Sequence, residues 1–179
     1  IATNHNINDV EWLQNLNEEI TWIKSDPIQE ISQQLRQNKQ AGKTINELHI
    51  VAHGNNSEVK LGNTFLTKQY LEESAHLLQE WKIEAIYLWS CEAGRNTELI
   101  KTLGKITGAD VYTSKSEINS KQPNLSSSTG KEASLEALIG IARLNRWSGM
   151  LASTKILDAN YQQLDFDADN ITIGPAKGS

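Results

Sequence analysis

Hydrophobic positions along this chain fall into two alternating patterns. Short apolar runs, typical of strands buried in a sheet, cover residues 20–23, 45–52, 83–90 and 111–113. Between them, apolar residues recur every three or four positions, which predicts helices that begin at Asp26-Pro27 and that span 67–81 and 97–106. Strand–helix alternation of this kind predicts an α/β fold, a three-layer sandwich with a mostly parallel sheet and helices on both faces.

The remaining segments predict smaller elements around this series. Residues 1–3 resemble the stub of a strand, and a helix is expected around Val10, Leu13 and Leu16, extending to Asn17 and capped by Asn8 or Asp9. Residues 59–61 and 64–66, separated by Gly62-Asn63, predict a β-hairpin. The polar stretch 114–130 predicts an exposed loop, a helix follows around residues 135–142, and one strand is expected within 155–166. We therefore predict one α/β domain over 1–150 and a C-terminal extension over 151–179.

Composition narrows the classes of function. The 179 residues are 38% hydrophobic and 22% charged, as in an ordinary globular domain. The net charge of −5 argues against a nucleic-acid partner, and no apolar stretch reaches membrane-spanning length. A single cysteine cannot form an internal disulfide. Oligomeric state is left open by the sequence.

Two of the apolar runs end in reactive side chains. The run 45–52 is followed by His53-Gly54, and the run 83–90 is followed by Cys91, the only cysteine. The carboxyl ends of parallel strands meet at one edge of the sheet, so we expect His53 and Cys91 to lie side by side there. A thiol beside an imidazole is the smallest set of groups that can form a cysteine nucleophile. The position of Cys91 at a strand-to-helix turn favours the reactive thiolate form over the alternative, a cysteine that only packs in the core. The backbone amides of Gly54 and Cys91 are the candidate oxyanion hole.

Metal and cofactor sites are not indicated. His49 and His53 are four residues apart, but on a strand this spacing separates them by about 13 Å, too far to share an ion. Asp165, Asp167 and Asp169 lack the glycine and the glutamate of a calcium loop. We expect no metal and no cofactor.

Several of these segments together resemble a known fold family. They are residues 49–54, 61–66 and 88–91, with Leu103 and residues 107–111. In order and spacing they are similar to the caspase–hemoglobinase fold of clan CD cysteine peptidases, over about Ile20 to Glu117. The closest resemblance is to a bacterial domain of uncharacterised function near the start of large surface or secreted proteins. It implies a secreted or cell-surface location, a polypeptide substrate that includes the protein's own chain, His53 as general base and Cys91 as nucleophile.

The resemblance also implies where substrate binds. In relatives, the loop after the strand 111–113 helps to form the pocket for the residue before the cut, and here that loop contains Ser114 and Glu117. Glu117 favours a basic residue before the cut, whereas Lys115 would suit an acidic one. Trp89 is a candidate wall of the same pocket, although core packing also accounts for it. Arg146, Lys155 and Lys177 are the basic residues after which self-cleavage is expected.

Two other functions are compatible with the same residues. One is a non-catalytic interaction or adhesion module, which would bind through the hairpin and the segment 114–130 and would keep His53 and Cys91 as remnants. The other is a thiol-dependent hydrolase or transferase of a non-peptide acyl group. A lowered pKa and rapid alkylation of the Cys91 thiol favour the peptidase, whereas a buried, inert thiol favours the interaction module.

Overall fold

The centre of the protein is a seven-stranded sheet in a computed structural model that describes residues 1–4, 10–13, 16, 18–151, 154–157 and 163–166. The strand order is β2-β1-β3-β6-β7-β8-β9, and the first five strands are parallel while β8 and β9 are antiparallel. The strands are β1 (Ala2–Asn4), β2 (Thr21–Ile23), β3 (Glu47–Val51), β6 (Ala85–Trp89), β7 (Asp110–Thr113), β8 (Asn124–Ser127) and β9 (Glu132–Ser134). The predicted α/β fold with a mostly parallel sheet is thus confirmed.

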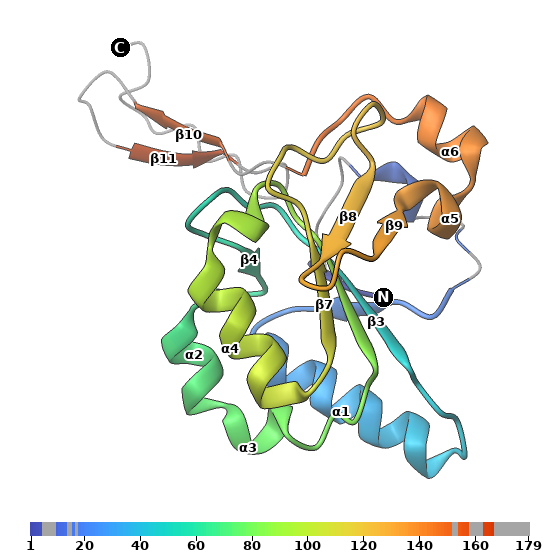
Figure 1. Cartoon of the computed structure of the whole chain (residues 1–179), viewed down its shortest axis with the longest axis vertical. Coiled ribbons are helices and arrows are strands. Elements are labelled where there is room, and N and C mark those ends of the chain that lie inside the picture. The colour runs from blue at the N-terminus through green and yellow to red at the C-terminus, as the bar shows by residue number, and fades with distance from the viewer. Residues whose placement is uncertain (5–9, 14–15, 17, 152–153, 158–162, 167–179) are drawn as a thin grey trace.

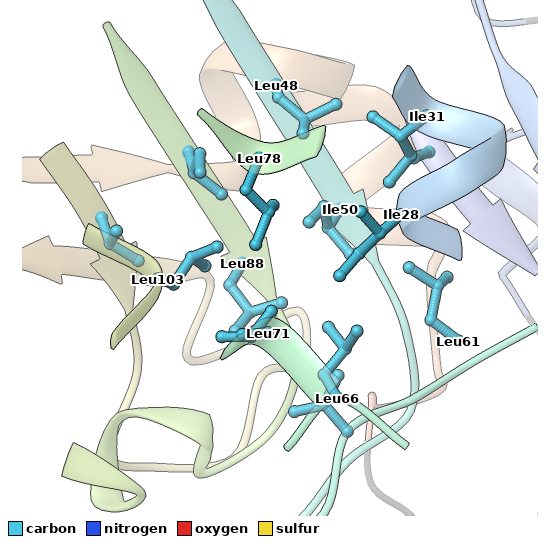
Figure 2. Packing of buried hydrophobic residues seen from close by; sticks show 14 of the residues in the cluster. Ile28, Ile31, Leu48, Ile50, Leu61, Leu66, Leu71, Leu78, Leu88 and Leu103 are labelled. Atoms are coloured by element: carbon cyan, nitrogen blue, oxygen red, sulfur yellow. The ribbon is translucent and has the colours of Figure 1, made fainter. Parts of the chain in front are cut away.

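One face of the sheet is covered by four helices, as Figure 1 shows. These are α1 (Pro27–Gln40), α2 (Lys68–Glu73), α3 (Ala75–Leu78) and α4 (Thr97–Thr107). Their buried leucines and isoleucines pack onto Ile50 of β3 and Leu88 of β6 in a continuous apolar cluster (Figure 2). Burying such side chains contributes about 1.5–3 kcal/mol each, so this face supplies much of the stability.

The opposite face is covered by shorter elements. They are the 3-10 turn η1 (Glu11–Leu13) and the helices α5 (Leu135–Ile139) and α6 (Ile141–Arg146), and both helices lie beside β8 and β9 in Figure 1. A second apolar cluster joins them to the sheet and includes Trp89, Cys91, Ile118, Trp147 and Leu151. Helical elements on both faces make the molecule a three-layer sandwich.

Local chemistry explains where the two longest helices begin and end. The Asp26 side chain accepts a hydrogen bond from the Gln29 amide at the start of α1, and Pro27 is its first residue. The Asn96 side chain caps α4 in the same way, and Gly108, with φ +73°, follows its last residue. Both helices match the prediction.

Other elements differ from the prediction. The expected helix over 67–81 is divided into α2 and α3 at Ser74, whose φ of −101° and ψ of 13° interrupt the helical path. The helix around 135–142 is divided at Gly140, whose φ of 84° and ψ of 155° are accessible essentially to glycine alone. The predicted hairpin forms as β4 (Lys60–Leu61) and β5 (Thr64–Phe65), and Gly62 turns the chain at φ +67°.

The expectation of an exposed loop over 114–130 was wrong. This segment contains β8, which pairs with β7, and it buries Ile118 and Leu125 completely or nearly so. β8 alternates exposed and buried residues, so Asn124 and Ser126 face solvent, while Leu125 joins the second cluster and Ser127 is buried. After residue 151, two strands form where one was expected: β10 (Thr154–Leu157) pairs antiparallel with β11 (Gln163–Phe166).

Some predicted features lie outside the described residues. They are the cap at Asn8 or Asp9, Asn17 in the expected first helix, Asp167 and Asp169 near the C-terminus, and Lys177. Within the described part of the chain, no helix combines the length and the apolar character needed to cross a membrane.

Candidate functional site

The ends of β3 and β6 place His53 and Cys91 at the same edge of the sheet. Val51 pairs with Trp89 across the two parallel strands, and the Ala52 amide donates to the Trp89 carbonyl at 3.1 Å. His53 and Cys91 each follow these paired residues by two positions. Strand alternation therefore directs both side chains toward the second face, where Cys91 joins the apolar cluster. Both residues are buried, with exposed fractions of 2% and 1%.

Gly54 and Ser90 meet on the other side of these strand ends. A Cβ atom at Gly54 would lie 2.1 Å from Ser90 Oγ and 2.8 Å from the Glu58 carbonyl oxygen, so only glycine fits there. This close approach brings the His53–Gly54 peptide against the turn that carries Cys91.

Two backbone amides converge on one carbonyl oxygen at this edge. The Gly54 N–H donates to the Leu151 oxygen at 3.1 Å, and the Cys91 N–H donates to the same oxygen at 3.0 Å. These are the two amides that the sequence suggested as an oxyanion hole. A pair of amides on one carbonyl oxygen is the arrangement that stabilises a developing oxyanion during acyl transfer.

The segment that carries this carbonyl runs beside the loop after β7. The Leu151 amide donates to the Ile118 carbonyl at 3.0 Å, and Met150 forms an antiparallel bridge with Asn119. The Leu151 side chain is 0% exposed and belongs to the same apolar cluster as Cys91 and Ile118. Residues 150–151 are thus an extended peptide laid across the edge that holds His53 and Cys91.

The Cys91 thiol is enclosed by these two segments. Its Sγ accepts a hydrogen bond from the Ile118 amide at 3.0 Å and donates to the Ile118 carbonyl at 3.8 Å. Burial raises the pKa of the thiol to about 11; backbone hydrogen bonds from Ile118 and Leu151 oppose this rise, and the carboxylates of Glu117 and Glu92 add to it.

The expected lowering of the thiol pKa is therefore absent in this conformation. The nearest long helix, α4, begins at Thr97, and its macrodipole is effective only within about one turn of its end. Between Cys91 and α4 lies the short turn η2 (Ala93–Arg95), preceded by Glu92 at φ +56°.

The loop that the sequence assigned to substrate binding does lie against the Cys91 turn. The Glu92 amide donates to the Ser116 carbonyl at 2.9 Å, and the Gly94 amide donates to the Ser114 carbonyl at 2.8 Å. Arg95 Nε adds a bond to the Lys115 carbonyl at 2.7 Å. The Glu117 side chain is exposed, and its negative charge acts on Cys91. Ser114 and Glu117 thus border the site.

Trp89 lies in the core instead. It is 0% exposed, and its indole N–H donates to His49 Nδ1 at 3.0 Å. His49, Tyr87 and Tyr112 stack in register across β3, β6 and β7, with ring centroids 4.4 and 4.5 Å apart. Trp89 packs beside this aromatic ladder, so its role in the structure is that of a packing residue. Among the described residues, His49 and His53 belong to no cluster of three metal-ligating side chains.

A cleft of about 620 Å³ lies next to the aromatic ladder. His49, Tyr87 and Trp89 contribute to its lining, together with Leu138 of α5, whereas neither His53 nor Cys91 does. This cleft is thus separate from the thiol and imidazole, whose edge of the sheet is filled by Leu151.

Two residues of the site were not identified from the sequence, namely Ile118 and Leu151. Ile118 is an isolated apolar residue between Glu117 and Asn119, whereas Leu151 lies in a short apolar stretch with Met150 and Ala152. This apolar character was the available signal, since both residues are completely buried in the structure. Neither has a reactive side chain, so chemistry alone could not select them.

Comparison with known proteins gives a family without an assigned function. Residues 4–151 match a protein family described as a domain of unknown function (DUF4347). Neither a curated protein nor a solved structure matches the chain.

Proposed function

The chain belongs to the DUF4347 family, and from the geometry of its strand-end site we propose that it is a cysteine endopeptidase that processes its own polypeptide. Cys91 is the proposed nucleophile, His53 the general base, and the amides of Gly54 and Cys91 the oxyanion hole. One observation carries the proposal: both amides donate to a peptide carbonyl of the same chain. The resemblance to clan CD peptidases in the residues around His53 and Cys91 supports it.

Each group has a role that its position permits. His53 takes the thiol proton, and the resulting thiolate attacks a peptide carbonyl carbon. The negative charge that develops on the carbonyl oxygen is stabilised by the two amides, which need no reorganisation because their strands already hold them in place. His53 then returns the proton to the departing amine. No metal or cofactor is needed for these steps.

The buried thiol fits this function as a closed state. Ile118 and Leu151 exclude water from Cys91, which keeps the thiol neutral and protects it from outside reagents. Acyl transfer to Cys91 then needs only proton transfer to His53 and a carbonyl that is already in place. Pre-positioning of this kind lowers the activation barrier of acyl transfer, because the thiol and the carbonyl do not first have to meet by diffusion.

The same burial favours one alternative, a non-catalytic interaction module. A raised thiol pKa is the property expected of a structural cysteine. The two functions differ in whether His53 controls the reactivity of Cys91, and this is open to direct measurement.

The test uses an affinity label on the full chain. In a Leu151→Gly background, which removes the side chain that fills the site, peptidyl acyloxymethyl ketones ending in Leu or in Arg are added and the adduct on Cys91 is mapped by mass spectrometry. We expect an adduct that forms at least tenfold more slowly when His53→Ala is added. The two probes also compare an apolar with a basic residue before the cut.

Cys91→Ser in the same background is the negative control for labelling. Iodoacetamide labelling in urea confirms that the thiol is intact in the other variants. Equal labelling with and without His53 would remove the catalytic role of the histidine and favour the interaction module.

A further inference from the structure

The peptide that occupies the proposed oxyanion hole belongs to the protein's own chain, and its position identifies a bond. We infer that Leu151–Ala152 is the bond that this protein cleaves in itself, with Leu151 as the residue before the cut. The inference rests on the proposed peptidase function and adds the cleavage point and an apolar specificity to it.

Three contacts hold residues 150–151 in the manner of a bound substrate. The Leu151 oxygen accepts from the Gly54 and Cys91 amides, the Leu151 amide donates to the Ile118 carbonyl, and Met150 bridges Asn119 in antiparallel fashion. Extended peptides are commonly recognised by such strand addition, which fixes the peptide through its backbone. Because the oxygen of Leu151 lies between the two donors, the carbonyl carbon presented to Cys91 is that of Leu151.

The surroundings of the side chain determine the specificity. Leu151 is 0% exposed and shares its cluster with Cys91, Ile118 and Trp147. A charged side chain in this cluster would lose its hydration without gaining a partner, which disfavours it at this position. Glu117, which the sequence suggested as a partner for a basic residue, is exposed to solvent. An apolar residue before the cut therefore replaces the basic one.

The cut is a two-step acyl transfer. The Cys91 thiol gives its proton to His53 while Sγ bonds to the Leu151 carbonyl carbon, and the carbonyl electron pair moves onto oxygen. Collapse breaks the Leu151–Ala152 bond, the proton passes from His53 to the Ala152 nitrogen, and a thioester remains. Water then gives its proton to His53 and its hydroxyl to the acyl carbon, the C–S bond breaks, and the thiolate recovers the proton. The net reaction is hydrolysis of one peptide bond.

The segment that fills the site belongs to the unit shared by the family, because the match covers residues 4–151.

The experiment follows the intact mass of the full chain over time at pH 7–9. We expect the wild type to yield two fragments, 1–151 and 152–179, with a first-order rate that does not change on tenfold dilution. Cys91→Ala and His53→Ala should stay intact, alone or mixed with wild type. Ile141→Ala, at a side chain that is 52% exposed and has no role in the site, is the matched control and should cleave at the wild-type rate.

Two substitutions test the bond itself. Leu151→Asp should abolish the cut, and its folding is checked by urea denaturation. Ala152→Pro leaves the buried Leu151 side chain in place, replaces the leaving amine with a ring nitrogen, and should slow the cut at least 100-fold.

The outcomes separate the inference from the proposed function. A Cys91-dependent cut at another bond, or an intact wild type whose Leu151→Gly form accepts the ketone label in a His53-dependent way, would overturn the Leu151–Ala152 assignment and leave the peptidase in place. An intact wild type without His53-dependent labelling would overturn both.

Discussion

At the scale of single residues, the protonation of Cys91 couples the site to stability. The folded thiol has its pKa raised to about 11 by burial, whereas an unfolded cysteine titrates near 8.5–9. Between these values the unfolded chain binds fewer protons, so the free energy of unfolding falls as the pH rises. Relative to Cys91→Ala, the wild type should lose about 1.5–2 kcal/mol by pH 10 and about 2–3 kcal/mol by pH 11.

Urea titrations of both proteins from pH 8 to 11 measure this difference, because tyrosines and lysines contribute equally to each. Parallel pH dependences would show that the thiol is not protonated preferentially in the folded state.

The residue after Cys91 carries backbone strain. Glu92 has φ +56°, a region that costs a residue with a side chain about 1–2 kcal/mol. Glu92→Gly should stabilise the fold by about 0.5–1 kcal/mol, since the contact with Arg95 at 3.7 Å is a surface ion pair of little worth. It also removes a carboxylate that raises the pKa of Cys91, so the thiol should titrate at lower pH.

Lys82→Gly is the matched control for Glu92→Gly, because Lys82 also has positive φ (51°) and its charge is not among those that shift the pKa of Cys91. It should give a similar stabilisation in thermal melts without changing the pH dependence of Cys91 alkylation. A lowered pKa of Cys91 in both variants would show that backbone relaxation, and not the loss of charge, causes the effect.

At the scale of elements, the end of β3 depends on the absence of a side chain at Gly54. Gly54→Ala would place Cβ 2.1 Å from Ser90 Oγ and 2.8 Å from the Glu58 carbonyl, which forces the strand end away from the Cys91 turn. Displacing one of two oxyanion donors should slow self-cleavage about 100-fold, and the strain should cost about 1–3 kcal/mol of stability.

Gly104→Ala in α4 is the control, since its Cβ makes only ordinary contacts at 3.6 Å and alanine favours a helix. Cleavage rate and urea midpoint are measured for both. Wild-type cleavage by a folded Gly54→Ala protein would remove the Gly54 amide from the mechanism.

The sequence predicted those elements whose pattern is local. The runs that became β3 and β6 are mostly apolar, so the positions of His53 and Cys91 at the strand ends could be inferred directly. The segment 114–130 was misread because β8 is a short, mostly polar strand that depends on pairing with β7. Leu151 was missed for a related reason: its role lies in its backbone carbonyl, which every residue possesses, and only the folded chain brings that carbonyl to Gly54 and Cys91.

At the scale of the whole molecule, access to Cys91 should depend on release of residues 150–151 from the sheet edge. Full burial of a leucine side chain contributes about 2 kcal/mol, so removing it should raise the population of the open form about 30-fold. Leu151→Gly should therefore be alkylated by iodoacetamide about 30-fold faster than the wild type at pH 8 under native conditions.

Met150→Gly changes backbone freedom equally but removes a side chain that is 39% exposed, and should show a much smaller increase. Urea titration of each variant separates this local opening from global unfolding, because only the latter scales with total stability. Equal acceleration in the two variants would mean that Ile118 alone encloses the thiol, and that the site opens without moving the peptide that fills it.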